Sequence, residues 1–168
     1  MGVWNRFGDH LPPDRCRHGL ALHLQTFWAK HRNGEGWANC ELYLLRNIPK
    51  TGVGFFKTAG FYPDFLLWLK RGAAQALAFV DPKGLTHWEE EKVALLTTIR
   101  ELALDLPMVA FIATPTQLSG IPLPGIAPGD KAAYLANRHV LLQDDPDYVA
   151  VILEELHACL PVPTETAV

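Results

Sequence analysis

The sequence has few cysteines and no long hydrophobic run. Its three cysteines, Cys16, Cys40 and Cys159, form no C-x-x-C pair. An odd number without such spacing argues against a disulfide framework and a zinc ribbon, and it favours a reducing compartment. No apolar stretch approaches the roughly 18 residues of a membrane span, and Pro12 and Pro13 interrupt the N-terminus where a signal peptide needs an apolar core. We therefore expect a cytoplasmic protein without a membrane partner.

An excess of positive charge is also lacking. The 15 Lys and Arg residues are outnumbered by 18 Asp and Glu, and the net charge of −3 excludes the strongly cationic class of nucleic-acid binders. Any contact with nucleic acid must therefore be local. A chain of 168 residues with 49% hydrophobic content favours one globular domain with its own core. We expect that domain to span residues 1–160 and residues 161–168 to form a flexible tail.

Proline and glycine residues divide the chain into predicted helices and strands of the α/β class. Helices are expected at residues 19–32, in a run that follows Thr86, shortly after residue 129, and at about 146–159. Strands are expected at residues 41–48, 53–57, 62–70, 75–83, 108–113 and 139–143. The third and fourth of these strands are apolar on both faces and are separated by a short turn. The sequence therefore predicts a tight hairpin at the centre of a sheet with helices on both faces.

The run after Thr86 has a strongly helical pattern. Thr86 is a predicted N-cap, and Glu89 follows three residues later to complete a capping box. We interpret Glu89, Glu90 and Glu91 as acids of the first turn, where they suit the helix dipole. The predicted buried stripe consists of Val93, Leu96, Ile99 and Leu102.

Three charged residues converge at one end of the predicted hairpin. A hairpin centred between Gly72 and Ala73 places Asp64 directly opposite Asp81. Opposite residues share a face, with Cβ atoms about 5 Å apart. Lys83 follows Asp81 by two residues, so we expect it on the same face. The pattern therefore predicts two carboxylates and one ammonium group close together.

This group of charges suggests a metal-dependent hydrolytic site. Two carboxylates so close repel each other unless a cation or a proton lies between them, and hard divalent ions such as Mg²⁺ prefer oxygen ligands. Asp64 and Asp81 are therefore predicted metal ligands. Beside such an ion, Lys83 would orient the nucleophile or stabilise the pentavalent state of a phosphodiester. The alternative is a solvated strand end with a salt bridge.

The sequence around these residues resembles a known nuclease family. Pro63-Asp64 followed by Asp81-Pro82-Lys83 is similar to the bipartite signature of the PD-(D/E)XK nuclease superfamily, and the predicted elements from residue 18 to residue 113 follow its order. The longer strings GVGFFKTAGFYPDFLLWLK and ALAFVDPKGL resemble the nuclease domain at the C-terminal end of large DEAD/DEAH-helicase proteins related to type III restriction subunits. The resemblance implies a restriction-endonuclease-like core of order αβββαβ, with a mixed central sheet flanked by helices.

The resemblance also assigns roles to individual residues. It makes Asp64 and Asp81 metal ligands, the carbonyl of Pro82 a further candidate ligand, and Lys83 the catalytic lysine. Many members add a glutamate from the first helix, whereas the first predicted helix here contains no acid. Glu41, at the start of the next predicted strand, is the nearest substitute, with a solvated strand end as the alternative.

The implied function is that of a Mg²⁺-dependent endodeoxyribonuclease, with Mn²⁺ as a substitute ion, in restriction, defence or DNA processing. The expected partners are DNA and a fused or separate helicase or translocase, because a net charge of −3 predicts weak, strongly salt-dependent DNA binding by this chain alone. Two alternatives stay open: an inactive nuclease-fold module that binds DNA or docks a partner, and a hydrolase that acts on RNA. Neither sequence specificity nor oligomeric state follows from the sequence.

Overall fold

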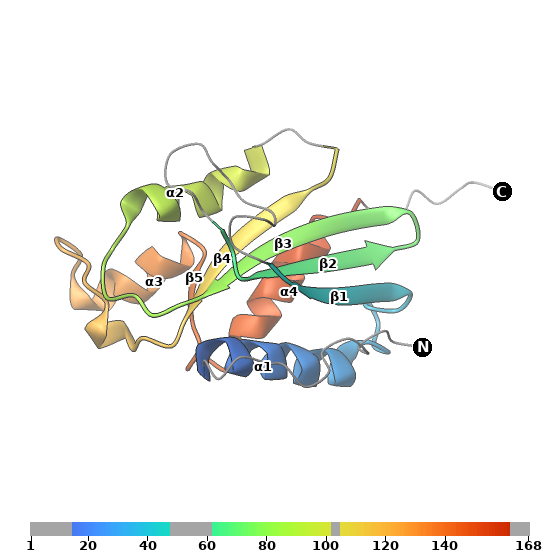
Figure 1. Ribbon diagram of the computed structural model, residues 1–168, viewed down its shortest axis with the longest axis horizontal. Coiled ribbons are helices and arrows are strands. Elements are labelled where there is room, and N and C mark those ends of the chain that lie inside the picture. Colours follow the sequence, from blue (N-terminus) through green and yellow to red (C-terminus); the bar gives the residue numbers. More distant parts are fainter. Residues whose placement is uncertain (1–14, 48–61, 102–104, 162–168) are drawn as a thin grey trace.

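A mixed β-sheet forms the centre of the molecule (Figure 1). The computed structural model describes residues 15–47, 62–101 and 105–161. Within these ranges the sheet has five strands in the order of the chain, namely β1 (Cys40–Arg46), β2 (Phe65–Arg71), β3 (Ala74–Pro82), β4 (Met108–Thr114) and β5 (Val140–Leu142). Strands β1 and β2 are antiparallel, as are β2 and β3, whereas β4 runs parallel to β3 and β5 parallel to β4. The predicted α/β class is therefore confirmed.

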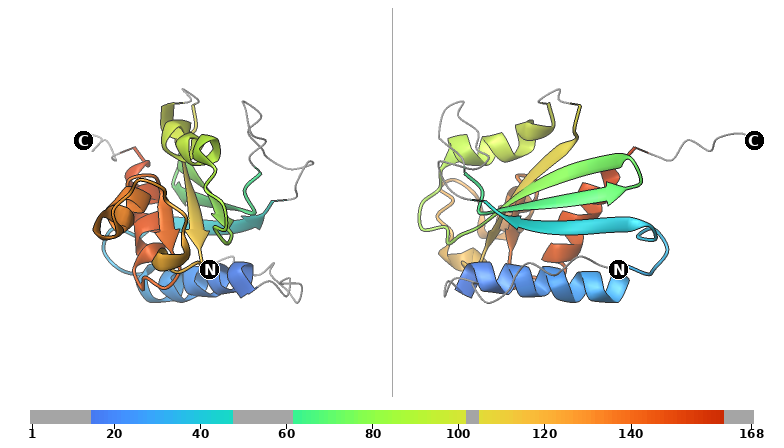
Figure 2. Two further views of the ribbon diagram at one scale, coloured as in Figure 1. Left: turned by 90° about the vertical axis from the view of Figure 1, so that its left-hand side faces the viewer. Right: turned by 45° about the vertical axis from the view of Figure 1, so that its right-hand side comes forward.

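Helices flank the sheet and connect its parallel strands. Those in the described ranges are α1 (Arg15–His31), α2 (Glu90–Thr98), α3 (Lys131–Ala136) and α4 (Tyr148–Ala158). Helix α2 lies between β3 and β4, and α3 between β4 and β5, because parallel neighbours need a crossover connection. Figures 1 and 2 show α1 and α4 on one side of the sheet and α2 on the other. None of these helices combines the length and the apolar character that crossing a lipid bilayer requires.

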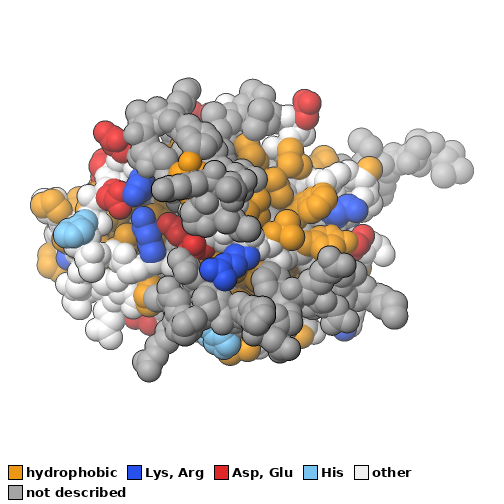
Figure 3. Space-filling model, in the orientation of Figure 1, with side chains coloured by type: hydrophobic (Ala, Val, Ile, Leu, Met, Phe, Trp, Pro, Cys, Tyr) orange, Lys and Arg blue, Asp and Glu red, His pale blue; other side chains and the backbone are white. Residues whose placement is uncertain are grey.

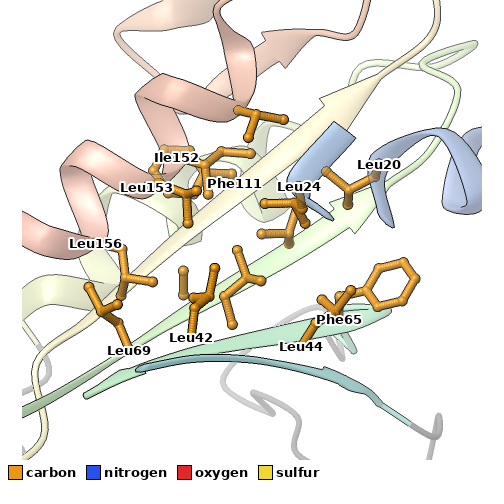
Figure 4. Packing of buried hydrophobic residues seen from close by; sticks show 14 of the residues in the cluster. Leu20, Leu24, Leu42, Leu44, Phe65, Leu69, Phe111, Ile152, Leu153 and Leu156 are labelled. Atoms are coloured by element: carbon orange, nitrogen blue, oxygen red, sulfur yellow. The ribbon is translucent and has the colours of Figure 1, made fainter. Parts of the chain in front are cut away.

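The face of the sheet under α1 and α4 carries the larger core (Figure 4). Leu20 and Leu24 lie one helical turn apart in α1 and are both fully buried. Ile152 and Leu156 show the same spacing in α4. Alternate residues of the strands, such as Phe65, complete this cluster. One face of the central hairpin is therefore sealed from water.

A second core covers the opposite face. It contains Leu66 and Phe79 from the hairpin, together with Val93 and Leu96 from α2. Strand β4 contributes to both cores, and all of its residues are buried. This is the expected burial for a parallel strand in the interior of a sheet. The apolar hairpin strands were predicted to be covered on both faces, and the two cores confirm that prediction.

The main error in the predicted elements concerns the start of α2. The helix begins at Glu90, and Glu89 is its N-cap without a side-chain capping bond, so the predicted capping box from Thr86 is wrong. Residues 83–89 instead connect the end of β3 to the helix, and the backbone N–H of Leu85 in this connection donates to the Thr116 hydroxyl. The predicted strand 53–57, Leu102 and residues 162–168 of the predicted tail lie outside the described residues.

Candidate active site

The register of the central hairpin matches the prediction. The β2–β3 ladder ends at the pair Phe65 and Val80, and Asp64 and Asp81 are the residues that adjoin this last pair. The turn consists of Gly72 and Ala73, and Gly72 has a positive φ of 60°. Type II′ hairpin turns require this conformation at their first central position, where glycine adopts it without steric cost. The turn therefore fixes the register of the pairs from Arg71–Ala74 to Phe65–Val80.

Strand alternation relates the ends of the hairpin to the core under α2. Asp81 is two residues beyond Phe79, and Asp64 is two residues before Leu66. Both of these apolar residues belong to the core under α2. Because alternate residues of a strand share a face, Asp81 lies on the α2 face near the end of β3, whereas Asp64 is a bend residue just before β2.

Asn47 attaches the segment around Asp64 to the end of β1. Its backbone N–H donates to the Asp64 carbonyl oxygen at 2.8 Å, which continues the β1–β2 ladder by one residue. Its side-chain Nδ2 donates to the Pro63 carbonyl oxygen at 2.8 Å, and the residue is 5% exposed. No local sequence pattern identifies this asparagine, because only the folded ladder places it beside the Pro63-Asp64 dipeptide.

We expect Asn47→Ala to lower the free energy of unfolding by about 1–3 kcal/mol, because it removes the side-chain donor from a buried carbonyl. Urea unfolding followed by circular dichroism measures this loss. Asn137→Ala is the matched control, since Asn137 is exposed at the end of α3. Its expected change is below about 0.5 kcal/mol. Equal stability of the two variants would show that the Asn47 amide does not hold this segment.

Lys83 lies between two carboxylates. Its Nζ is 3.6 Å from Oδ2 of Asp81 and 3.6 Å from Oε1 of Glu89. The Asp81 side chain is 13% exposed and that of Lys83 28%, so the contact is partly shielded from water. In Figure 3, acidic and basic side chains lie side by side where β3 ends and α2 begins. The predicted proximity of Lys83 and Asp81 is therefore confirmed.

Glu89 is a residue of this site whose contact the sequence analysis missed. In addition to Lys83, its carboxylate contacts the ammonium group of Lys92 one turn into α2. The hydrogen bond from Lys92 lowers the pKa of the Glu89 carboxyl, although desolvation acts in the opposite direction, and the charges of Lys83 and Lys92 lower it further. Glu89 is therefore ionised at neutral pH and available to bind both lysines.

Thr116 secures the connection that follows Lys83. Its hydroxyl accepts a hydrogen bond from the Leu85 backbone N–H at 2.9 Å. Its own backbone N–H donates to the hydroxyl of Thr114, the fully buried last residue of β4, at 3.1 Å. These bonds attach the chain just after Lys83 to the neighbouring parallel strand. No sequence signal identified Thr116, because its partner is 31 residues away.

Glu41 does not lie near the two aspartates, and its prediction as a substitute metal ligand is wrong. It pairs with Lys70, which is six residues along β2 from Asp64. At about 3.3 Å per residue the separation along the strand is about 20 Å. The physical reason is that β1 is antiparallel to β2, so the start of β1 lies at the far end of the hairpin from Asp64. The Glu41 carboxylate instead accepts a hydrogen bond from the Tyr43 hydroxyl.

The residues present fit a magnesium site with few protein ligands. Within the described ranges no group of three or more His, Cys, Asp and Glu residues is placed to hold a metal ion. Mg²⁺ does not require such a group, since it is commonly bound by one or two carboxylates together with water and substrate phosphates. Asp64 and Asp81 would supply two carboxylates near one end of the hairpin. A site of this kind is therefore compatible with the hairpin.

Comparisons with known proteins found no match to this chain. No protein-family model matches the sequence, and no curated protein or solved structure matches it significantly. The resemblance to the PD-(D/E)XK nucleases therefore rests on the Pro63-Asp64 and Asp81-Pro82-Lys83 strings and on the order of the elements.

Proposed function

We propose that this chain is a Mg²⁺-dependent endonuclease with a restriction-endonuclease-like core that hydrolyses phosphodiester bonds of DNA. The observation that carries the proposal is the ammonium group of Lys83, 3.6 Å from the Asp81 carboxylate, at the hairpin end that also bears Asp64. The element order supports it, because a helix, three antiparallel strands, a helix and a parallel strand follow one another from α1 to β4. This is the αβββαβ order that the sequence resemblance implies.

Asp64 and Asp81 would hold the metal ion. A bound Mg²⁺ would neutralise negative charge on the phosphate and lower the pKa of the attacking water. The two carboxylates match its charge, and their position at the end of a sheet buried on both faces keeps the backbone beneath them rigid. The Asn47 amide holds the Pro63 carbonyl beside one ligand, and the Thr116 hydroxyl holds the chain beyond the other.

Lys83 would stabilise charge on the phosphate group. In hydrolysis the oxygen of water forms a bond to phosphorus and gives up one proton to solvent, the bond from phosphorus to the leaving oxygen breaks, and the leaving oxygen takes up a proton from solvent. Negative charge is spread over the equatorial phosphoryl oxygens in the transition state. A fixed ammonium group beside these oxygens lowers the barrier because it needs little reorganisation during the reaction. The contacts of Lys83 with Asp81 and Glu89 support this role, because they restrain the ammonium group.

A helicase or translocase partner would supply most of the affinity for DNA. The chain has a net charge of −3, and the lysines nearest the proposed site are paired with carboxylates. The protein alone is therefore expected to bind DNA weakly and with a strong dependence on salt. The narrower sequence resemblance, to nuclease domains of DEAD/DEAH-helicase proteins, supports such a partner in restriction, defence or DNA processing.

A second candidate is an inactive module that binds DNA or docks a partner through the same fold. The observation that favours it is helix α1, whose sequence RCRHGLALHLQTFWAKH contains no acid that would add to the ligands of a metal. The exclusion of Glu41 strengthens this candidate, because it removes the nearest substitute. An RNA hydrolase would use the same residues as the DNA enzyme.

A cleavage assay on supercoiled plasmid, linear duplex, single-stranded DNA and RNA distinguishes these candidates. We expect the wild-type chain to cut DNA with Mg²⁺ or Mn²⁺ and to be inactive in EDTA. Calorimetric titration with Mn²⁺ in parallel should show binding of the ion. Cleavage of RNA alone would show that the substrate is RNA and not DNA. Absence of both cleavage and ion binding would favour the inactive module.

A further inference from the structure

Among the residues that the structure describes, Lys83 has two carboxylate partners, and one of them, Asp81, is a predicted metal ligand. Lys83 Nζ is 3.6 Å from both Asp81 and Glu89. Glu89 comes from the N-terminus of α2, on the far side of the connection that follows β3. The lysine therefore bridges the hairpin and the helix.

A divalent ion bound to Asp81 would weaken one of the two contacts of Lys83. The ion would compete with Lys83 for the Asp81 carboxylate, and its two positive charges would repel the ammonium group. With the ion bound, the contact with Asp81 alone would hold the Lys83 ammonium group poorly during phosphodiester hydrolysis. The carboxylate of Glu89 is the other partner that the structure gives to Lys83.

We propose that Glu89 is a positioning residue, which keeps Lys83 beside the phosphate while a divalent ion occupies Asp64 and Asp81. This inference rests on the proposed nuclease function. It differs from the role that the sequence analysis gave to Glu89, which was an acid of the first helical turn. It also differs from a role as a third metal ligand.

Glu89 is itself held in place by α2. Its carboxylate binds Lys92, and its carbonyl oxygen accepts the backbone N–H groups of Lys92 and Val93 at 3.1 and 3.0 Å. Val93 is 1% exposed and belongs to the core under the helix. The carboxylate therefore projects from a packed frame and not from a freely moving loop.

The start of α2 is also fixed against α3. Glu90 Oε1 is 3.8 Å from Nε of Arg138, and the guanidinium group of Arg138 lies 3.6 Å from the ring centroid of Tyr134. The Trp88 ring packs against the Tyr134 ring, with centroids 5.9 Å apart. Glu90 thus has a partner in the turn after α3, whereas Glu89 contacts Lys83 and Lys92. This difference makes Glu90 a matched control.

The test compares Glu89→Gln with Glu90→Gln, each in the wild-type and Lys83→Met backgrounds. Two quantities are measured: the affinity for Mn²⁺ by calorimetry, and the single-turnover rate of DNA cleavage at saturating Mg²⁺. We expect Glu89→Gln to slow cleavage about 10- to 100-fold, as misplacement of a catalytic group does, with Mn²⁺ affinity within about twofold of wild type. Glu90→Gln should leave both quantities near wild type.

The double variant shows whether Glu89 acts through Lys83. In the Lys83→Met background, Glu89→Gln should cause no further loss of rate, because the group that it positions is already absent. Glu89→Asp should recover part of the rate, since it restores the carboxylate on a shorter side chain.

Three results would overturn the inference while leaving the nuclease function intact. A tenfold or greater loss of Mn²⁺ affinity in Glu89→Gln would make Glu89 a metal ligand. An equal loss of rate in both backgrounds would mean that it does not act through Lys83. An unchanged rate in Glu89→Gln would return Glu89 to the helix-dipole role. By contrast, a wild-type chain that neither binds Mn²⁺ nor cuts DNA would refute the proposed function itself, and this inference with it.

Discussion

Asp81→Asn is expected to abolish divalent-cation binding and to reduce DNA cleavage by at least about 1,000-fold. Asp81 is one of the two carboxylates proposed to hold the ion, and loss of its charge leaves Asp64 as the remaining one. The substitution keeps the size and shape of the side chain. Asp81 lies at the end of β3, so the strand pairing beside it should survive.

Isothermal titration with Mn²⁺ and a plasmid-cleavage time course measure these losses. Glu41→Gln is the matched control, because it removes one carboxylate charge from the same sheet at about 20 Å along the hairpin. It should bind Mn²⁺ and cut DNA like the wild type. Near wild-type cleavage by Asp81→Asn would rule out the carboxylate as a metal ligand.

Lys83→Met is expected to reduce cleavage by about 100- to 1,000-fold while metal binding is retained or becomes stronger. The rate falls because the fixed positive charge beside the phosphate is lost. Affinity for the ion does not fall, because the ammonium group no longer competes for Asp81, 3.6 Å away. Methionine keeps an unbranched stem of similar length, and Lys83 lies just beyond the strand end, so folding should be preserved.

Single-turnover kinetics and the same Mn²⁺ titration separate these two effects. Lys70→Met is the control, since Lys70 lies in β2 at the other end of the hairpin. Its effect on both quantities should be less than about twofold. If Lys83→Met cut DNA as fast as this control, Lys83 would have no catalytic role, and its ion pairs would be structural.

The hairpin could be predicted from the sequence because its signals are local. Two apolar runs flank Gly72, and this glycine adopts the positive φ that a two-residue turn needs. The turn sets the register, and the register sets which residues lie opposite each other. For this reason the hairpin pairs up to Phe65–Val80 could be predicted from the positions of a few residues in the chain.

The surroundings of the site depend on contacts that local patterns do not encode. Glu41 is close in sequence to the hairpin but lies at its far end, because strand direction decides which ends meet. The capping-box pattern at Thr86 placed Glu89 inside the helix. In the structure the Lys83–Trp88 segment is part of a connection attached to Thr116, and Glu89 is left at the helix start, facing Lys83. Asn47 and Thr116 likewise act through partners that only the folded chain provides.

The central claim is that Asp64 and Asp81 share one divalent cation at the end of the hairpin. Anomalous diffraction from crystals soaked in Mn²⁺ tests it most directly, because the ion is located independently of any activity. We predict one anomalous peak on the α2 face of the sheet, bound directly by a carboxylate oxygen of each aspartate, with Lys83 still in contact with Glu89. A peak bound elsewhere, or no peak between these two side chains at saturating Mn²⁺, would contradict the account.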